Sequence, residues 1–143
     1  MNLGRFGLLL ALGCLQVSPA RANCLEYGPA TVMLTGMISE RVDPGPPGYG
    51  ETPARDAKEL HYYLRPDEAV CVAAKPGDEV DVAESGVKEM QMVYFNPLPF
   101  RREWLGKHVR VQGTLFHGIS GHHHTAVLIN VSGTHVMKVK LEP

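Results

Sequence analysis

Histidines are concentrated in residues 117–125, which read His-Gly-Ile-Ser-Gly-His-His-His-Thr. If the Gly-Ile-Ser-Gly segment forms the turn of a β-hairpin, His117 and His122 become cross-strand partners with Cβ atoms roughly 5 Å apart. His124 then shares the face of His122 and His123 points away, because side chains alternate along a strand. Neutral imidazoles bind both Zn²⁺ and Cu²⁺. The spacing therefore predicts a metal site made of His117, His122 and His124.

The same histidines allow other interpretations. A polar hairpin tip can carry them without a metal, and their gain of charge below about pH 6.5 can make the binding of a partner depend on pH. Ser120 lies among them and raises the hypothesis of a hydrolase, but the Gly-x-Ser-x-Gly spacing of a nucleophile elbow is missing. There is also no phosphate-binding glycine loop and no His-Glu-x-x-His motif. We therefore do not expect an enzyme.

Prolines and glycines dominate residues 43–53. Each proline removes a backbone donor and each glycine loosens the chain, so this segment predicts a long surface loop. A loop of this kind is either functional or a flexible excursion. Tyr49 at its centre is a candidate anchor for a ligand, and we add His123 and Tyr27 as further candidate binding residues.

The chain begins with a pattern typical of a secretory leader. Arg5 precedes the apolar residues 6–15, and the small residues around position 22 predict cleavage after Ala22. The apolar run is shorter than the roughly 20 residues needed to cross a membrane. We therefore expect a signal peptide over residues 1–22, no transmembrane segment, and a periplasmic or secreted protein.

The composition predicts one globular domain over residues 23–143, because 44% of the chain is hydrophobic and 20% is charged. Cleavage removes Arg5 and Arg21 but no acidic residue, so the formal net charge falls from −1 to −3. A mildly acidic domain lacks the positive field that attracts nucleic acid. We expect a monomer whose partner is a protein or a small ligand.

The cysteines fit an oxidising compartment. Cys14 lies in the expected leader, where it offers a less favoured lipid-attachment site, so Cys24 and Cys71 remain as a pair. We predict a disulfide between these two; free thiols are the alternative. By loop entropy the bond would contribute about 4 kcal/mol.

Alternation of apolar and polar residues predicts an all-β chain. The fold class that fits is a small OB-like Greek-key barrel of about five strands, with one short helix between the third and fourth strands; a β-sandwich is the alternative. Gly36, inside the first strand, predicts a bulge or a bend. The helix is expected over 100–105, and the strand segments over 30–39, 60–65, 69–73, 87–95, 108–116, 125–131 and 135–141.

Several segments together resemble a family of small exported bacterial proteins classed only as a domain of unknown function. They are the Cys-Leu-Glu-Tyr-Gly-Pro start, the Pro-Gly-Pro-Pro loop, the Val-Cys-Val segment, the run from Leu105 to His117, and Gly-His-His-His-Thr. The resemblance spans nearly the whole expected mature chain. It implies an OB-like barrel, a periplasmic or secreted location and pairing of Cys24 with Cys71, and it supplies no activity.

The leading hypothesis from the sequence is a non-catalytic binding module. Its proline-rich loop and its histidine hairpin would contact a protein or a small ligand. A histidine metal site for Zn²⁺ or Cu²⁺ is the second hypothesis, and a hydrolase that uses Ser120 is the third.

Overall fold

The computed structural model describes residues 24–94 and 100–138. The expected leader, residues 1–22, lies outside the described residues, and so does Cys14. Among the residues described, no helix is long and apolar enough to cross a membrane.

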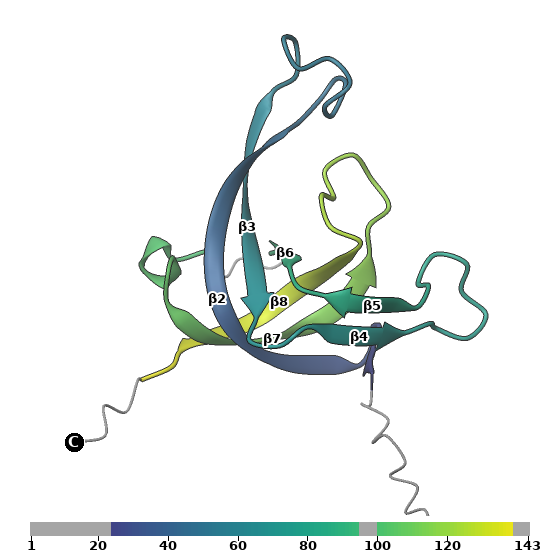
Figure 1. The fold of residues 1–143 in the computed structure, drawn as a ribbon, viewed down its shortest axis with the longest axis vertical. Coiled ribbons are helices and arrows are strands. Elements are labelled where there is room, and N and C mark those ends of the chain that lie inside the picture. Colours follow the sequence, from purple (N-terminus) through teal and green to yellow (C-terminus); the bar gives the residue numbers. More distant parts are fainter. Residues whose placement is uncertain (1–23, 95–99, 139–143) are drawn as a thin grey trace, which may run out of the picture.

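Five strands close into a barrel (Figure 1). Neighbours around it run in the order β2, β3, β6, β8, β7, and β7 pairs with β2 again to close the ring. The pairing of β6 with β8 is parallel, and the other four pairings are antiparallel. The five are β2 (Thr31–Pro44), β3 (Lys58–Pro66), β6 (Met90–Val93), β7 (His108–His117) and β8 (Val127–Val136).

This topology confirms the expected OB-like barrel. Counted along the chain, the first, second and third barrel strands are neighbours, and the fifth strand lies between the third and the fourth. The expected helix lies between the third and fourth barrel strands, as the 3₁₀ helix η1 (Arg102–Trp104). Closure leaves the barrel without a free edge that could pair with another chain.

The long strand β2 serves two neighbours, and Gly36 is the residue where it changes partner. Residues 31–37 pair with β7, while residues 36–44 pair with β3. A Cβ atom on Gly36 would lie 2.1 Å from the carbonyl oxygen of Arg65, so only glycine allows this approach of the two backbones.

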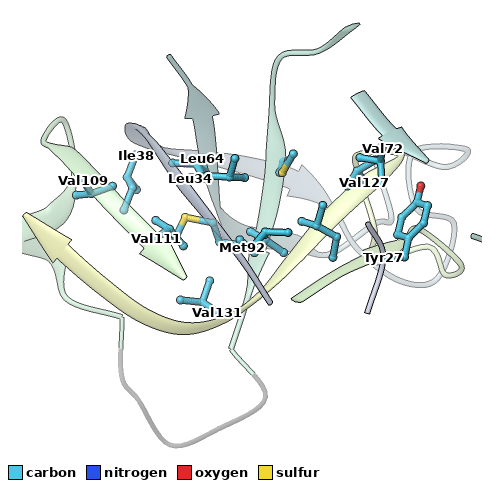
Figure 2. Packing of buried hydrophobic residues seen from close by; sticks show 14 residues of the cluster. Tyr27, Leu34, Ile38, Leu64, Val72, Met92, Val109, Val111, Val127 and Val131 are labelled. Atoms are coloured by element: carbon cyan, nitrogen blue, oxygen red, sulfur yellow. The ribbon is translucent and has the colours of Figure 1, made fainter. Parts of the chain in front are cut away.

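The hydrophobic core fills the barrel (Figure 2). It is built from alternate residues, as in β7, where Val109, Val111 and Leu115 are buried and Arg110 and Gln112 are exposed. Alternation works because successive side chains on a strand point to opposite faces. The other strands contribute in the same way; among their buried members are Val32, Leu34, Ile38, Leu64, Met90, Met92, Val127, Ile129 and Val131.

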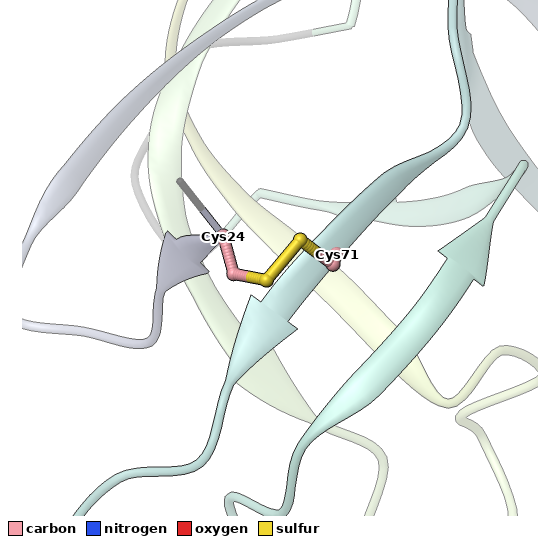
Figure 3. Close-up of a disulfide and its surroundings, with 2 residues drawn as sticks. All are labelled: Cys24 and Cys71. Carbon is pink, nitrogen blue, oxygen red and sulfur yellow. A yellow bond between two sulfur atoms is a disulfide. The ribbon is translucent and has the colours of Figure 1, made fainter. Parts of the chain in front are cut away.

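A second, three-stranded sheet lies beside the barrel. Its strands are β1 (Leu25–Glu26), β4 (Val70–Ala73) and β5 (Glu84–Val87), with β4 in the middle. The predicted disulfide is present: Cys24, just before β1, bonds to Cys71 in β4 (Figure 3). The bond ties the start of the described chain to the middle of this sheet.

Three strand predictions need correction. The segment 69–73 joins this side sheet, not the barrel, as β4. The single strand expected over 87–95 is two strands, β5 and β6, in different sheets. The two strands expected at the C-terminal end, over 125–131 and 135–141, form the single strand β8. The pairing of β7 with β8 continues on both sides of a register shift near Gly113. Residues 139–141 lie outside the described part. The Ser-Gly pair of residues 132–133 thus marks a β-bulge and not a turn.

Candidate functional site

Two loops lie at the same end of the barrel (Figure 1). The proline loop, residues 45–57, joins β2 to β3, and the histidine loop, residues 118–126, joins β7 to β8. They meet at Tyr49, whose hydroxyl oxygen lies 3.1 Å from Nε2 of His122. The two rings meet edge to face, with centroids 5.0 Å apart. The two segments that the sequence marked as distinctive therefore form one surface, which we call the two-loop surface.

Gly121 makes this contact possible. A Cβ atom on it would lie 2.5 Å from Cγ of Tyr49, so the tyrosine ring packs directly on the glycine backbone. Tyr49 itself has φ 47°, a conformation that is uncommon outside glycine. The sequence indicates Tyr49 as an anchor, and it indicates for Gly121 only a place in the turn.

Asp56 organises the proline loop. Its carboxylate accepts hydrogen bonds from the N–H groups of Gly48 (2.8 Å), Gly50 (2.7 Å) and Thr52 (3.2 Å). The Thr52 hydroxyl donates a fourth bond at 2.6 Å. The Thr52 hydroxyl first, and then the backbone N–H groups, hold the pKa of Asp56 below its ordinary value. The loop is therefore an ordered structure built around one carboxylate.

His123, a predicted binding residue, is used inside its own loop. Its Nδ1 accepts a hydrogen bond from the N–H of Ile119 at 2.9 Å, and its ring lies edge-on to Phe116 with centroids 5.5 Å apart. Its N–H donates to the carbonyl oxygen of Ser120 at 3.0 Å. Burial, together with the neighbouring histidines, lowers the pKa of His123. Since Nδ1 of His123 is occupied by Ile119, that nitrogen does not serve Ser120 as a base.

His117 lies away from the other two predicted metal ligands. It pairs with Val127 and not with His122, so the expected hairpin register is wrong. Its Nε2 lies 3.1 Å from Oε1 of Glu84 in β5, and its Nδ1 lies 3.1 Å from the carbonyl oxygen of the next residue. The connection between the strands spans residues 118–126, so it is longer than the four-residue turn over 118–121 that would have paired His117 with His122.

Tyr27 also lies outside the two-loop surface. It is buried, and its hydroxyl donates a 2.9 Å hydrogen bond to the carbonyl oxygen of Val82. Burial, helped by Glu84 and Asp81, raises the pKa of Tyr27 to about 12. It borders a cleft of about 640 Å³ between residues 26–30 and 73–76, which shares no residue with the two loops. These contacts tie Tyr27 to the side sheet.

A chain of acidic and imidazole groups runs from the loops along the wall formed by β2 and β3. Nδ1 of His122 lies 2.8 Å from Oε2 of Glu59, and that oxygen lies 3.7 Å from Nε2 of His61. Nδ1 of His61 lies in turn 3.2 Å from Oδ2 of Asp43. Asp43 and Glu59 are cross-strand partners, and Glu59 and His61 are two residues apart on β3. These three side chains therefore share one face of the β2–β3 pair.

Asp43 is the buried end of this chain, with 7% of its surface exposed. Its Oδ1 accepts a 2.7 Å hydrogen bond from Nε of Arg41, and its Oδ2 accepts a short one from the hydroxyl of Tyr63. Arg41 also stacks on the Tyr63 ring, 3.9 Å from its centroid. Burial alone would raise the pKa of Asp43, but the bonds from Tyr63 and Arg41 outweigh it and lower the pKa. The carboxylate is therefore held in its charged form.

His124 covers the same face from the histidine loop. Its ring lies with its centroid 5.0 Å from that of His61. Its Nε2 is buried and has no hydrogen-bond partner within the described residues. Its N–H donates to Oε1 of the buried Gln91 at 2.7 Å, and Nε2 of Gln91 donates to the carbonyl oxygen of His122 at 2.9 Å. Gln91 thus fixes the position of the histidine pair over the wall.

The sequence motifs did not point to Asp43, Glu59 or His61 as site residues. A local signal exists, because Glu59 and His61 are two residues apart on a strand and so point to one side. Their proximity to His124 has no local signal, since His124 follows His61 by 63 residues in the chain.

Part of the chain matches the model of a protein family of unknown function. A family model described as a domain of unknown function (DUF4431) matches residues 89–137, which hold β6, η1, β7, the histidine loop and β8. The match thus includes Gln91 and all of the histidine loop, and leaves out the proline loop and both cysteines of the disulfide. No curated protein and no solved structure matches the chain.

Proposed function

We propose that the chain is a non-catalytic binding module, acting in the periplasm or outside the cell, that binds a protein or a small ligand at the two-loop surface. The observation that carries the proposal is the packing of Tyr49 on Gly121 and His122. It joins two loops that are far apart in the sequence into one surface at the end of the barrel. In OB folds the loops at the corresponding positions are a common place for ligands.

The surface is organised before any ligand arrives. Asp56 fixes the proline loop through four hydrogen bonds, and Gln91 fixes the histidine loop through its side-chain amide. Preorganised loops lose little conformational entropy on binding, which favours affinity. The order within both loops therefore supports a binding role.

Apolar side chains are exposed around the surface. Ile119 in the histidine loop is 70% exposed. Tyr49 adds an aromatic ring that is 36% exposed. An aromatic anchor with apolar neighbours is typical of the centre of an interface.

The disulfide supports the proposed location. Such bonds persist in oxidising compartments, and the leader expected over residues 1–22 would deliver the chain there. The parts of the proposal are thus mutually consistent.

Site-specific photo-cross-linking in cells that naturally make the protein tests the proposal. A photoreactive amino acid replaces Tyr49 or Ile119 in the full chain, and a matched control carries it at Met33, which is 59% exposed on β2 outside the two loops. We expect the same adduct from the two loop positions and none from Met33. Equal capture from Met33, or capture that survives shortening of both loops, would overturn the proposal.

A further inference from the structure

We propose that Asp43, His61 and His124 form a binding site for one divalent transition-metal ion, with Zn²⁺ as the reference ion, at the base of the histidine loop. Within the described residues, each of the three offers a ligand atom, and these atoms all lie within 4.8 Å of one another. The site replaces the metal set expected from the sequence and keeps only His124 of it. It does not depend on the proposed binding of a ligand by the two loops.

The unpartnered nitrogen of His124 is the main geometric argument. Buried polar atoms in proteins almost always have a hydrogen-bond partner, so a buried imidazole nitrogen without one needs an explanation. This nitrogen belongs to a ring packed against His61, which itself contacts Asp43. A metal ion between these groups would satisfy it.

The distances suit a small ion. A tetrahedral Zn²⁺ with ligand bonds of about 2 Å places its ligand atoms about 3.4 Å apart. Oδ2 of Asp43 and Nδ1 of His61 already lie 3.2 Å apart. The three ligand atoms lie within 4.8 Å of one another, so any pair that is not yet at this spacing would have to approach by at most about 1.4 Å.

The donor set selects the class of ion. Two imidazole nitrogens and one carboxylate oxygen suit Zn²⁺ and Cu²⁺, while Mg²⁺ and Ca²⁺ prefer oxygen ligands alone.

The surroundings of Asp43 resemble the outer layer of a metal site. Metal-binding carboxylates are usually held by further hydrogen bonds that fix their orientation. Arg41 donates to Oδ1 at 2.7 Å, and Tyr63 donates to Oδ2, the same oxygen that faces Nδ1 of His61. A carboxylate oxygen has two lone pairs, so Oδ2 can accept the Tyr63 hydrogen bond and still bind a metal. The positive charge of Arg41 weakens the attraction of the site for a cation. The negative charge of Glu59, which lies beside His61, offsets this effect.

Calorimetric titration of the full, oxidised chain with Zn²⁺, after removal of bound metal by a chelator, tests the site. We expect one saturable Zn²⁺ per chain, and loss of affinity by more than about 100-fold in His61→Gln and in His124→Gln. Ca²⁺ should give no saturable heat. Binding should also raise the thermal midpoint of the wild-type protein and of neither variant.

His117→Gln is the matched control, because it removes an imidazole from the set that the sequence suggested while leaving these three residues intact. We expect it to bind Zn²⁺ as the wild type does. Electron paramagnetic resonance with Cu²⁺ should show nitrogen ligands that are lost in His61→Gln, and circular dichroism without metal should show that both variants are folded.

Two results would overturn the site. One is the absence of saturable Zn²⁺ binding, in which case the cluster is a hydrogen-bonded network only. The other is a loss of affinity in His117→Gln as large as that in His61→Gln. Neither result alters the cross-linking expected at Tyr49, so failure of the metal site can be told apart from failure of the binding module.

Discussion

The side sheet and the two-loop end are both built from chain segments that are distant in sequence, yet they are held by different forces. Cys24 and Cys71 join the side sheet covalently, and Tyr27 and Val72 bury apolar surface beside them. The two-loop end is held by the carboxylate of Asp56, by the amide of Gln91 and by one ring on a glycine.

The difference separates what stabilises the fold from what it presents to solvent. Covalent closure and apolar burial act without regard to direction, so they suit a region whose task is to persist. Hydrogen bonds to carboxylates and amides fix direction but add little net stability each. The two-loop end therefore places chemical groups accurately, and it relies on the barrel and the side sheet for stability.

The largest effect is expected from loss of the disulfide. In a Cys24→Ala, Cys71→Ala double variant the 47-residue separation is no longer closed, and we expect the free energy of unfolding to fall by about 4 kcal/mol. Urea unfolding measures this, and a reducing agent should destabilise the wild type alone. Hydrogen exchange should quicken first in the side sheet. If the two loops lost protection from hydrogen exchange before the side sheet did, the side sheet would not be the region that the disulfide stabilises.

An intermediate effect is expected from Tyr63→Phe. The change leaves the buried carboxylate of Asp43 with one donor fewer, which should cost about 1–3 kcal/mol of unfolding free energy. Tyr49→Phe is the matched control, since it removes a hydroxyl from an exposed contact and should change stability by less than about 0.5 kcal/mol. Equal losses of unfolding free energy in the two variants would show that the hydrogen bonds to Asp43 are no more important to the fold than the contact between the loops.

The smallest effect on global stability is expected from the titration of Asp56. Its pKa is lowered in the folded loop, so the ordering it provides is complete above the ordinary value of 3.8 and is lost as the pH falls through the folded pKa. Nuclear magnetic resonance should show the amides of Gly48 and Gly50 becoming mobile in that range while the barrel stays folded. Thr52→Val should raise the pKa of Asp56. A pKa at or above 3.8 in the wild type would contradict the role given to this carboxylate.

Much of the fold could be predicted because its signals are local. Alternation placed the strands of the barrel that have one buried face, such as residues 108–116, and the pair of cysteines predicted their bond. The C-terminal strand was misread because Ser-Gly pairs serve bulges as well as turns. The ladder opposite Gly113 decides between them, and that ladder is formed by a distant segment.

The candidate site was harder to predict. The sequence marked both loops, and the structure joins them through Tyr49. The sequence could not show that His117 faces Glu84 while His124 faces His61, because the length and path of the histidine loop set those directions.

The sequence by itself determined the alternation that makes a small β-barrel, the cysteine pair and the two unusual loops, because each follows from residue type and short spacing. The tertiary structure alone decided which histidine meets which acid. The closure of the barrel brings β2 and β3 under a loop that comes much later in the chain. A side chain's neighbours across such a closure depend on the register of every strand between them, and no local pattern contains that information.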